Sequence, residues 1–192
     1  MKLMEMLEKY STNSLHAQVV KNISMMLFEE TNKKVREMPE KYRKYLEAAS
    51  LLHDIGYYID SKGHNKHSMN IVIEHGLEGF DITEEKMIAC ICRYHRGSLP
   101  DKEEHEIYNT LDKKERKIVK RLAGILRIAD GLDKGHFNII ENITINNDIE
   151  NNIVEILIKT KGNDFHPDIS DAIRKRDLYE IAFKCQCVLK FV

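Results

Sequence analysis

The sequence predicts a mostly α-helical protein: a helical bundle over residues 1–137, followed by a small α+β subdomain over residues 138–192 that packs on it. Two observations predict this division. Apolar residues recur at helical spacing up to about Phe137. Beyond Phe137 they alternate with polar residues in segments rich in β-branched side chains, which is typical of strands. A β-β-α-β unit of this length is too small to bury much core alone, so we expect it to pack on the bundle.

Five helices are expected in the first part, each placed by its apolar face and its end signals. They cover residues 15–30, 39–52, 66–75, 83–94 and 113–131. Ser14 is the expected N-cap of the first helix, Pro39 lies in the first turn of the second, and Gly76 ends the third. The second half of the fifth helix is strongly apolar.

The second part is expected to begin with two strands, over residues 139–147 and 151–161, joined through an asparagine-rich turn. Helical spacing returns over residues 169–182, and residues 183–192 alternate again as a final strand.

The composition excludes several classes of protein. With 42% apolar and 32% charged residues and a net charge of −1, the chain is typical of a soluble globular protein, and it lacks the basic field that holds a nucleic acid duplex. Its apolar runs fall short of the roughly 18 residues of a membrane span. The N-terminus does not resemble a signal peptide, so we expect a cytoplasmic protein whose four cysteines are free thiols.

Histidines and aspartates recur near the predicted helix ends. The pair His53-Asp54 ends an apolar run, and burying it is costly unless something compensates the charge. Divalent metal ions would do so, because imidazole and carboxylate are suitable ligands for them. The candidate ligands of a first ion are His16, His53, Asp54 and Asp130. Asp54 would bridge to a second ion held by His67 and His95, and Asp133 is a second-ranked alternative to Asp130 because it follows the expected helix.

These residues stand in four segments whose order resembles the HD superfamily of metal-dependent phosphohydrolases. The closest resemblance is to the C-terminal HD half of the exopolyphosphatase / guanosine pentaphosphatase family, from about Ser14 to Val192. It is carried by LLHDIGYYI, GHNKHSMNIV, GLEGFDITEEKMIACICRYHRGSLP and RLAGILRIADGLDKGH. In that family an N-terminal region with an actin-like ATPase fold carries the phosphatase chemistry. This sequence shows no counterpart of that region, so we expect a free-standing HD domain with a metal site of its own.

The resemblance implies a metal-dependent phosphohydrolase that uses one or two divalent ions and a water activated by them. A nucleotide, a guanosine tetra- or pentaphosphate, a dinucleoside polyphosphate and polyphosphate are all candidate substrates, and Mn, Fe, Zn, Co, Ni and Mg are candidate ions. Asp54 and His64 are the candidate catalytic residues, with His64 protonating a leaving group or holding a phosphate. Cationic side chains near the ligands are the candidate phosphate-binding residues: Lys66, Arg93, Arg96, Arg127, Lys134 and His136.

Two other interpretations stay open at this point. The domain could be a non-catalytic regulatory module that binds a nucleotide or polyphosphate, or a structural helical domain with incidental histidines. The resemblance also suggests a homodimer, which the composition does not require.

Overall fold

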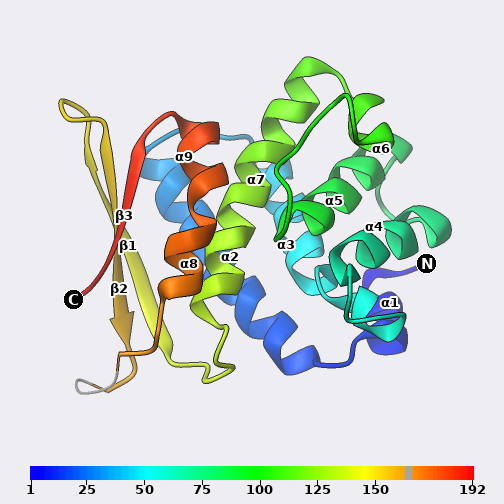
Figure 1. The fold of residues 1–192 in the computed structure, drawn as a ribbon, viewed down its shortest axis with the longest axis horizontal. Helices are drawn as coiled ribbons and strands as arrows, with labels where there is room; N and C mark the ends of the chain where they lie inside the picture. Colours follow the sequence, from blue (N-terminus) through cyan, green and yellow to red (C-terminus); the bar gives the residue numbers. More distant parts are fainter. Residues whose placement is uncertain (163–165) are drawn as a thin grey trace.

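The computed structural model describes residues 1–162 and 166–192, and it confirms a mostly helical protein with a small C-terminal sheet (Figure 1). Its helices are α1 (Leu3–Tyr10), α2 (Ser14–Lys34), α3 (Lys41–Leu52), η1 (Ile55–Tyr58), α4 (His64–His75), α5 (Ile82–Tyr94), α6 (Glu106–Asn109), α7 (Lys113–Leu132), α8 (Ser170–Lys175) and α9 (Asp177–Phe183). Its strands are β1 (Ile140–Asp148), β2 (Ile153–Thr160) and β3 (Gln186–Phe191).

Helix α7 is the centre of the bundle. It packs against α2, α3, α5, α8 and α9, and its apolar second half is buried, as the sequence indicates. Capping boxes fix the starts of α5 and α7, where Asp81 pairs with Glu84 and Asp112 pairs with Glu115. Because α7 touches both parts of the chain, it positions its last turn between them.

Several helix boundaries differ from the sequence prediction. Asn13 rather than Ser14 caps α2, because its Oδ1 accepts a hydrogen bond from the His16 amide. Helix α4 begins at His64, two residues earlier than expected, after Gly63 in a left-handed conformation. The sequence prediction did not include the helices α1, η1 and α6.

The sheet is mixed, with the strand order β1-β2-β3. Strands β1 and β2 form an antiparallel hairpin, whose turn has Asn152 at a positive φ of 57°. Strand β3 pairs parallel with β2, as a crossover through α8 and α9 requires. The sequence predicts one helix over residues 169–182, whereas the structure has two, α8 and α9, which meet at Arg176. Figure 1 shows the sheet at one end of the molecule, beside α2 and α9, and the N-terminus at the other.

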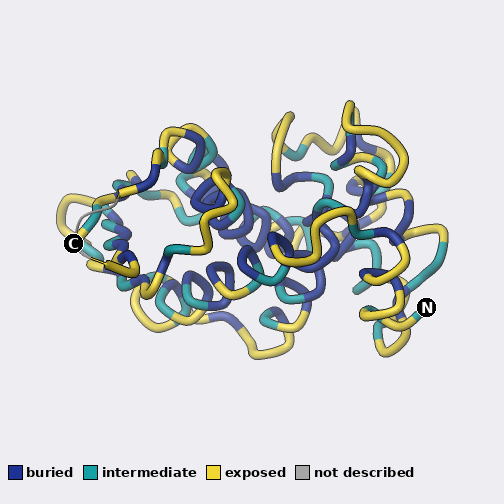
Figure 2. Tube along the Cα trace, turned by 90° about the horizontal axis from the view of Figure 1, so that it is seen from below, coloured by how far each residue is buried: buried dark blue, intermediate teal, exposed yellow. Residues whose placement is uncertain are grey.

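The two parts of the chain share one hydrophobic core. Apolar residues of the sheet, such as Ile143 and Ile156, belong to the same buried cluster as those of α2 and α7. Figure 2 shows the buried segments running through the middle of the molecule, with exposed turns around them. At Gly131 an added Cβ would lie 2.5 Å from the Cα of Ala172, so only glycine allows α7 and α8 to approach this closely. The boundary at residue 137 stays a prediction.

Candidate metal centre

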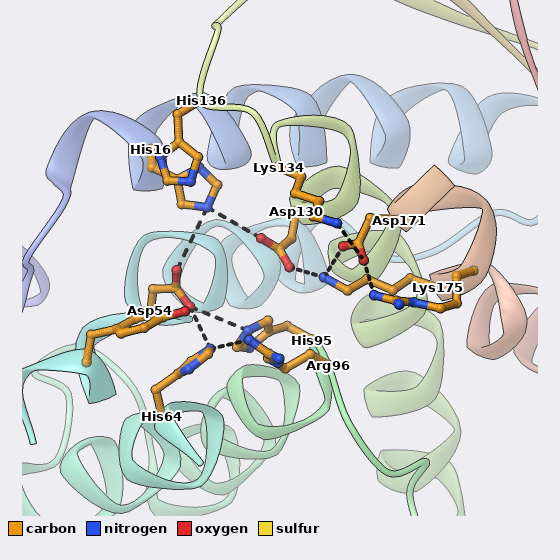
Figure 3. Close-up of a pocket in the computed structure, with 12 residues that line it drawn as sticks. His16, Asp54, His64, His95, Arg96, Asp130, Lys134, His136, Asp171 and Lys175 are labelled. Atoms are coloured by element: carbon orange, nitrogen blue, oxygen red, sulfur yellow. Dashed lines mark hydrogen bonds and ion pairs between the residues drawn. The ribbon is translucent and has the colours of Figure 1, made fainter. Parts of the chain in front are cut away.

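The ends of five helices bring histidines and aspartates to one cavity of about 380 Å³ (Figure 3). His16 lies in the first turn of α2, and His64 is the first residue of α4. His53 and His95 directly follow α3 and α5. Asp54 follows His53, and Asp130 lies in the last turn of α7. Helix ends, rather than helix faces, therefore build the site.

Asp54 lies between two sets of imidazole nitrogens. Its Oδ2 is 3.4 Å from His53 Nε2 and 3.8 Å from His16 Nε2. Its Oδ1 is 3.2 Å from His64 Nε2 and 3.5 Å from His95 Nε2. Each carboxylate oxygen thus faces a different pair of histidines, which is the arrangement of a bridging ligand.

Asp130 completes the first of these two sets. Its Oδ1 is 3.4 Å from His16 Nε2 and 3.6 Å from His53 Nε2. The ligand atoms of His16, His53 and Asp130 lie within 4.8 Å of one another, and so do those of His53, Asp54 and His95. Either group is compact enough to hold a metal ion, and because both contain His53 Nε2, only one of them can use that atom.

His16, His53, His64 and His95 direct the same nitrogen, Nε2, toward Asp54. The Nδ1 of His53, His64 and His95 lies 2.7 to 2.9 Å from the carbonyl oxygen three residues earlier, a contact in which only a protonated Nδ1 can donate. The Nδ1 of His16 lies 2.7 Å from Asp133 Oδ2 instead. Because the Nδ1 proton is held on the far side of each ring, Nε2 is the nitrogen that would bind a metal once it carries no proton of its own.

Two atoms of this cluster are buried without a hydrogen-bond partner, namely His53 Nε2 and Asp54 Oδ1. Buried polar groups are normally paired, because an unpaired one loses its hydration without compensation. His53 is fully buried, whereas the Asp54 side chain retains 26% of its exposure. The residues present therefore fit divalent cations, which would supply the partners that these two atoms lack.

The charges of the cluster shift its pKa values. Burial raises the pKa of Asp54 and Asp130, but the neighbouring histidines outweigh burial and hold both pKa values below the usual range. Burial lowers the pKa of His16, but its hydrogen bonds with Asp130 and Asp133 outweigh burial and raise the pKa to about 9. Burial, together with the charge on His53, lowers the pKa of His95 to about 3. The carboxylates are thus ionised, as metal ligands must be.

The chain around Asp54 is held by Gly56 and Ser68. The Ser68 hydroxyl donates to the His53 carbonyl oxygen at 2.6 Å and accepts from the Gly56 amide at 2.9 Å. A Cβ at Gly56 would lie 1.9 Å from the carbonyl oxygen of His64. This close contact between η1 and α4 brings His64 against Asp54, and it explains why glycine follows the His53-Asp54 pair.

Three of the predicted phosphate-binding residues line the cavity, namely Arg96, Lys134 and His136. Arg96 is exposed and places its Nη1 3.4 Å from His64 Nε2. Lys134 is 58% exposed. The His136 ring stacks on His16 at 4.3 Å, and its Nδ1 accepts a hydrogen bond from the Asn13 amide group.

The structure does not bring the other predicted residues to the cavity. His67 is half-buried one turn further along α4, and His64 occupies the place beside Asp54 and His95 that was expected for His67. The sequence prediction began this helix at Lys66 and left His64 in the preceding loop. Lys66 itself is exposed outside the cavity, and Arg93 lines a different pocket, beside His105.

Arg127 is buried and stabilises the fold instead of facing the cavity. Its guanidinium donates to the carbonyl oxygens of Tyr94 and Gly97 and forms an ion pair with Asp177 at 3.0 Å. These contacts fix the chain on either side of His95 and tie it to α9. Arg127 thus lies beside the site as a supporting residue.

Sequence reasoning missed a group of residues from α8 and η1 that also line the cavity: Tyr57, Asp171, Arg174 and Lys175. The Lys175 Nζ lies 2.6 Å from Asp130 Oδ2 and 2.8 Å from Asp171 Oδ2. The Tyr57 ring stacks on His64 at 3.9 Å. No local motif marks α8, because its residues reach the site only through the packing of the subdomain on α7.

The fold and the cluster together define the class of the molecule: a helical domain with a buried histidine–aspartate centre suited to metal. A family model described as Ppx/GppA phosphatase, domain III, matches residues 2–175, and the chain belongs to this family. The match confirms the predicted resemblance. It begins earlier than the expected Ser14 and ends at Lys175, so that α9 and β3 lie outside it. None of the described helices is long and apolar enough to cross a membrane.

Proposed function

We propose that the protein is a metal-dependent phosphohydrolase whose active site is the cluster around Asp54, and that its substrate is a nucleotide or another polyphosphorylated small molecule. The observation that carries this proposal is the common orientation of four Nε2 atoms toward the two oxygens of Asp54. A structural role for these histidines would require hydrogen-bond partners for the buried His53 Nε2 and Asp54 Oδ1, and neither atom has one.

The residues divide into two candidate ligand sets that share Asp54. His16, His53 and Asp130 would hold one ion with Asp54 Oδ2, and His64 and His95 would hold a second with Oδ1. This assignment gives His64 a ligand role in place of the acid role expected from the sequence. When bound, the ions would supply Lewis-acid chemistry and an activated water.

The cations at the cavity mouth would bind and orient the phosphate groups of a substrate. Arg96 lies on the side of the second ligand set, and Lys134 and Arg174 lie on the opposite side, next to Asp171. Phosphate oxygens favour such charged donors, and the guanidinium group can contact two oxygens at once. The buried Lys175 holds Asp130 by its second oxygen, so that Oδ1 stays directed toward His16 and His53.

The first experiment measures metal content and turnover on the same preparation. The purified chain is analysed by inductively coupled plasma mass spectrometry, and phosphate release is screened over nucleotides, dinucleoside polyphosphates and polyphosphate with Mn²⁺, Fe²⁺, Co²⁺ or Mg²⁺. We expect about two transition-metal ions per chain and phosphate release from at least one compound.

The variant Asp54→Asn should lose both the metal and the activity, because Asp54 is shared by the two ligand sets. Glu150→Gln, a carboxylate-to-amide change in the exposed β1–β2 turn, is the matched control and should change neither. Full metal content in Asp54→Asn would show that the ligand assignment is wrong, whereas metal without turnover in the parent chain would favour a sensor that only binds its ligand.

A further inference from the structure

A second cavity, of about 570 Å³, lies apart from the metal centre between the first half of α7, the end of α9 and the segment before α6. Figure 1 shows α7 and α9 side by side. The metal centre lies at the last turn of α7, whereas this cavity lies along its first two turns. Because a helix rises about 1.5 Å per residue, the roughly ten residues from Lys120 to Asp130 separate the nearest parts of the two cavities by about 15 Å along α7.

The cavity is strongly basic although the chain as a whole has a net charge of −1. Four cations stand on α7 at the spacing i, i+3, i+4 and i+7, which places them on one face of the helix. Two more come from neighbouring segments, and Asp101 is the one acidic residue in the lining. The six cations are Lys102, Lys113, Arg116, Lys117, Lys120 and Lys184.

Most of this charge is not neutralised within the protein. Over residues 1–162 and 166–192, no ion pair involves Lys113, Lys117, Lys120 or Lys184. Like charges three and four residues apart repel one another, and cations in the first turn of a helix oppose its dipole. The arrangement is unfavourable for the isolated chain, and an anionic ligand bound along α7 would make it favourable.

The lining of the cavity also has an apolar part. It is formed by Pro100, Ile181 and Ala182, and the Ile181 side chain is 52% exposed. A row of cations together with apolar surface in one cavity suits a ligand that combines a chain of phosphates with a flat, weakly polar ring. The volume is that of a small-molecule site rather than of a macromolecular surface.

From these observations we infer that this cavity is a binding site for a nucleoside polyphosphate, distinct from the metal centre. The phosphates contact Lys113, Lys117 and Lys120, and the base packs on Ile181 and Pro100. The inference does not rest on the proposed hydrolysis, because it requires neither a metal ion nor turnover.

The test measures the affinity of ATP and of inorganic tripolyphosphate by isothermal titration calorimetry in the presence of EDTA. EDTA removes the contribution of metal ions, and tripolyphosphate carries the phosphates without the base. Changing both Lys117→Glu and Lys120→Glu should weaken both ligands by more than tenfold, because two charged contacts are lost and replaced by repulsion.

The matched control is Lys114→Glu, which makes the same charge change one residue after Lys113 but does not line this cavity. It should change either affinity by less than about twofold, because an exposed charge outside the cavity is screened. Ile181→Ser should weaken ATP alone and leave tripolyphosphate unchanged.

Three results would overturn the inference. The first is equal weakening by Lys114→Glu, which would indicate a diffuse charge effect. The second is unchanged binding in the Lys117→Glu, Lys120→Glu variant, or no binding by the parent chain. The third is binding of a single-stranded RNA or an acidic peptide on this face while ATP does not bind. Because this test measures binding without metal, a negative result would not contradict the proposed hydrolysis. Likewise, a failure to detect hydrolysis would not contradict binding at the second cavity.

Discussion

The role of each histidine is set by what holds its other ring nitrogen. A backbone carbonyl three residues earlier holds Nδ1 of His53, His64 and His95, so the helix end itself orients the ring. His16 differs from these three, because the buried Asp133 orients its ring instead. The sequence ranked Asp133 as a competitor of Asp130 for metal, whereas the geometry makes it the partner of His16. The sequence predicted that an aspartate near the end of α7 takes part in the site. It could not predict that Asp133 orients His16 while Asp130 is a candidate ligand, because this depends on how far α7 extends.

Asp133→Ala should weaken metal binding by about 10- to 100-fold, because the partner that orients His16 and increases its basicity is lost. Asp133→Asn, which still offers an oxygen acceptor, should lose less. Metal titration monitored by calorimetry measures both. Unchanged affinity in Asp133→Ala would show that His16 needs no partner to bind.

Arg96→Ala should raise the KM for the substrate by about tenfold while metal content stays the same, because one charged contact to phosphate is removed. Arg93→Ala is the matched control: it lies three residues earlier on the chain and faces another pocket, so KM should not change. Steady-state kinetics and metal analysis on both variants check this. Loss of metal from Arg96→Ala would mean that Arg96 supports the ligands rather than the substrate.

At the scale of helices and strands, the long elements follow from apolar periodicity and the short ones do not. The helices α2, α3, α5 and α7 lie close to their predicted ranges, since each buries a long apolar face. Helix α4 begins two residues earlier than predicted, so that His64 is its first residue and lies in the site rather than in the preceding loop. Likewise, α8 ends at Lys175 where the pattern predicts a longer helix, and this end brings Lys175 to Asp130. Tertiary contacts decide such boundaries, and a single sequence does not contain them.

Gly131→Ala should destabilise the protein by about 1–3 kcal/mol, because the added methyl group must separate α7 from α8 in a closely packed core. Lys114→Ala, on the exposed start of the same helix, should be nearly neutral. Urea unfolding of both variants measures the difference. Equal stability of Gly131→Ala and the parent would show that α8 does not pack on α7 as closely as described.

For the whole molecule, the bundle and the sheet act as one unit around the metal centre. The bundle supplies the histidines and aspartates, and the subdomain supplies Lys175, Asp171 and Arg174. The sequence predicted both parts and their packing together, but it assigned the site to the bundle alone. Family membership is shown for residues 2–175, which includes α8 and therefore all the residues that line the metal centre.

Metal binding should raise the unfolding temperature of the whole chain in a single transition, since a ligand that binds only the folded state stabilises it. At a free-ion concentration 100 times the dissociation constant, the gain is about 2.7 kcal/mol for one site. Differential scanning fluorimetry with EDTA and then with Mn²⁺ or Fe²⁺ measures the shift, and Asp54→Asn should show none. A shift that persists in this variant would place the ion elsewhere.

The anchoring of every inward-facing ring at its Nδ1 has a consequence for how the centre is filled. Small metal domains that lack a core collapse into their folded form only when the ion arrives. Here backbone carbonyls and a buried carboxylate hold the candidate ligands in place, and a large hydrophobic core lies around them. If the proposed ions bind, we therefore expect that they can be removed and exchanged while the chain stays folded, so that the bound metal reflects supply and affinity rather than the history of folding.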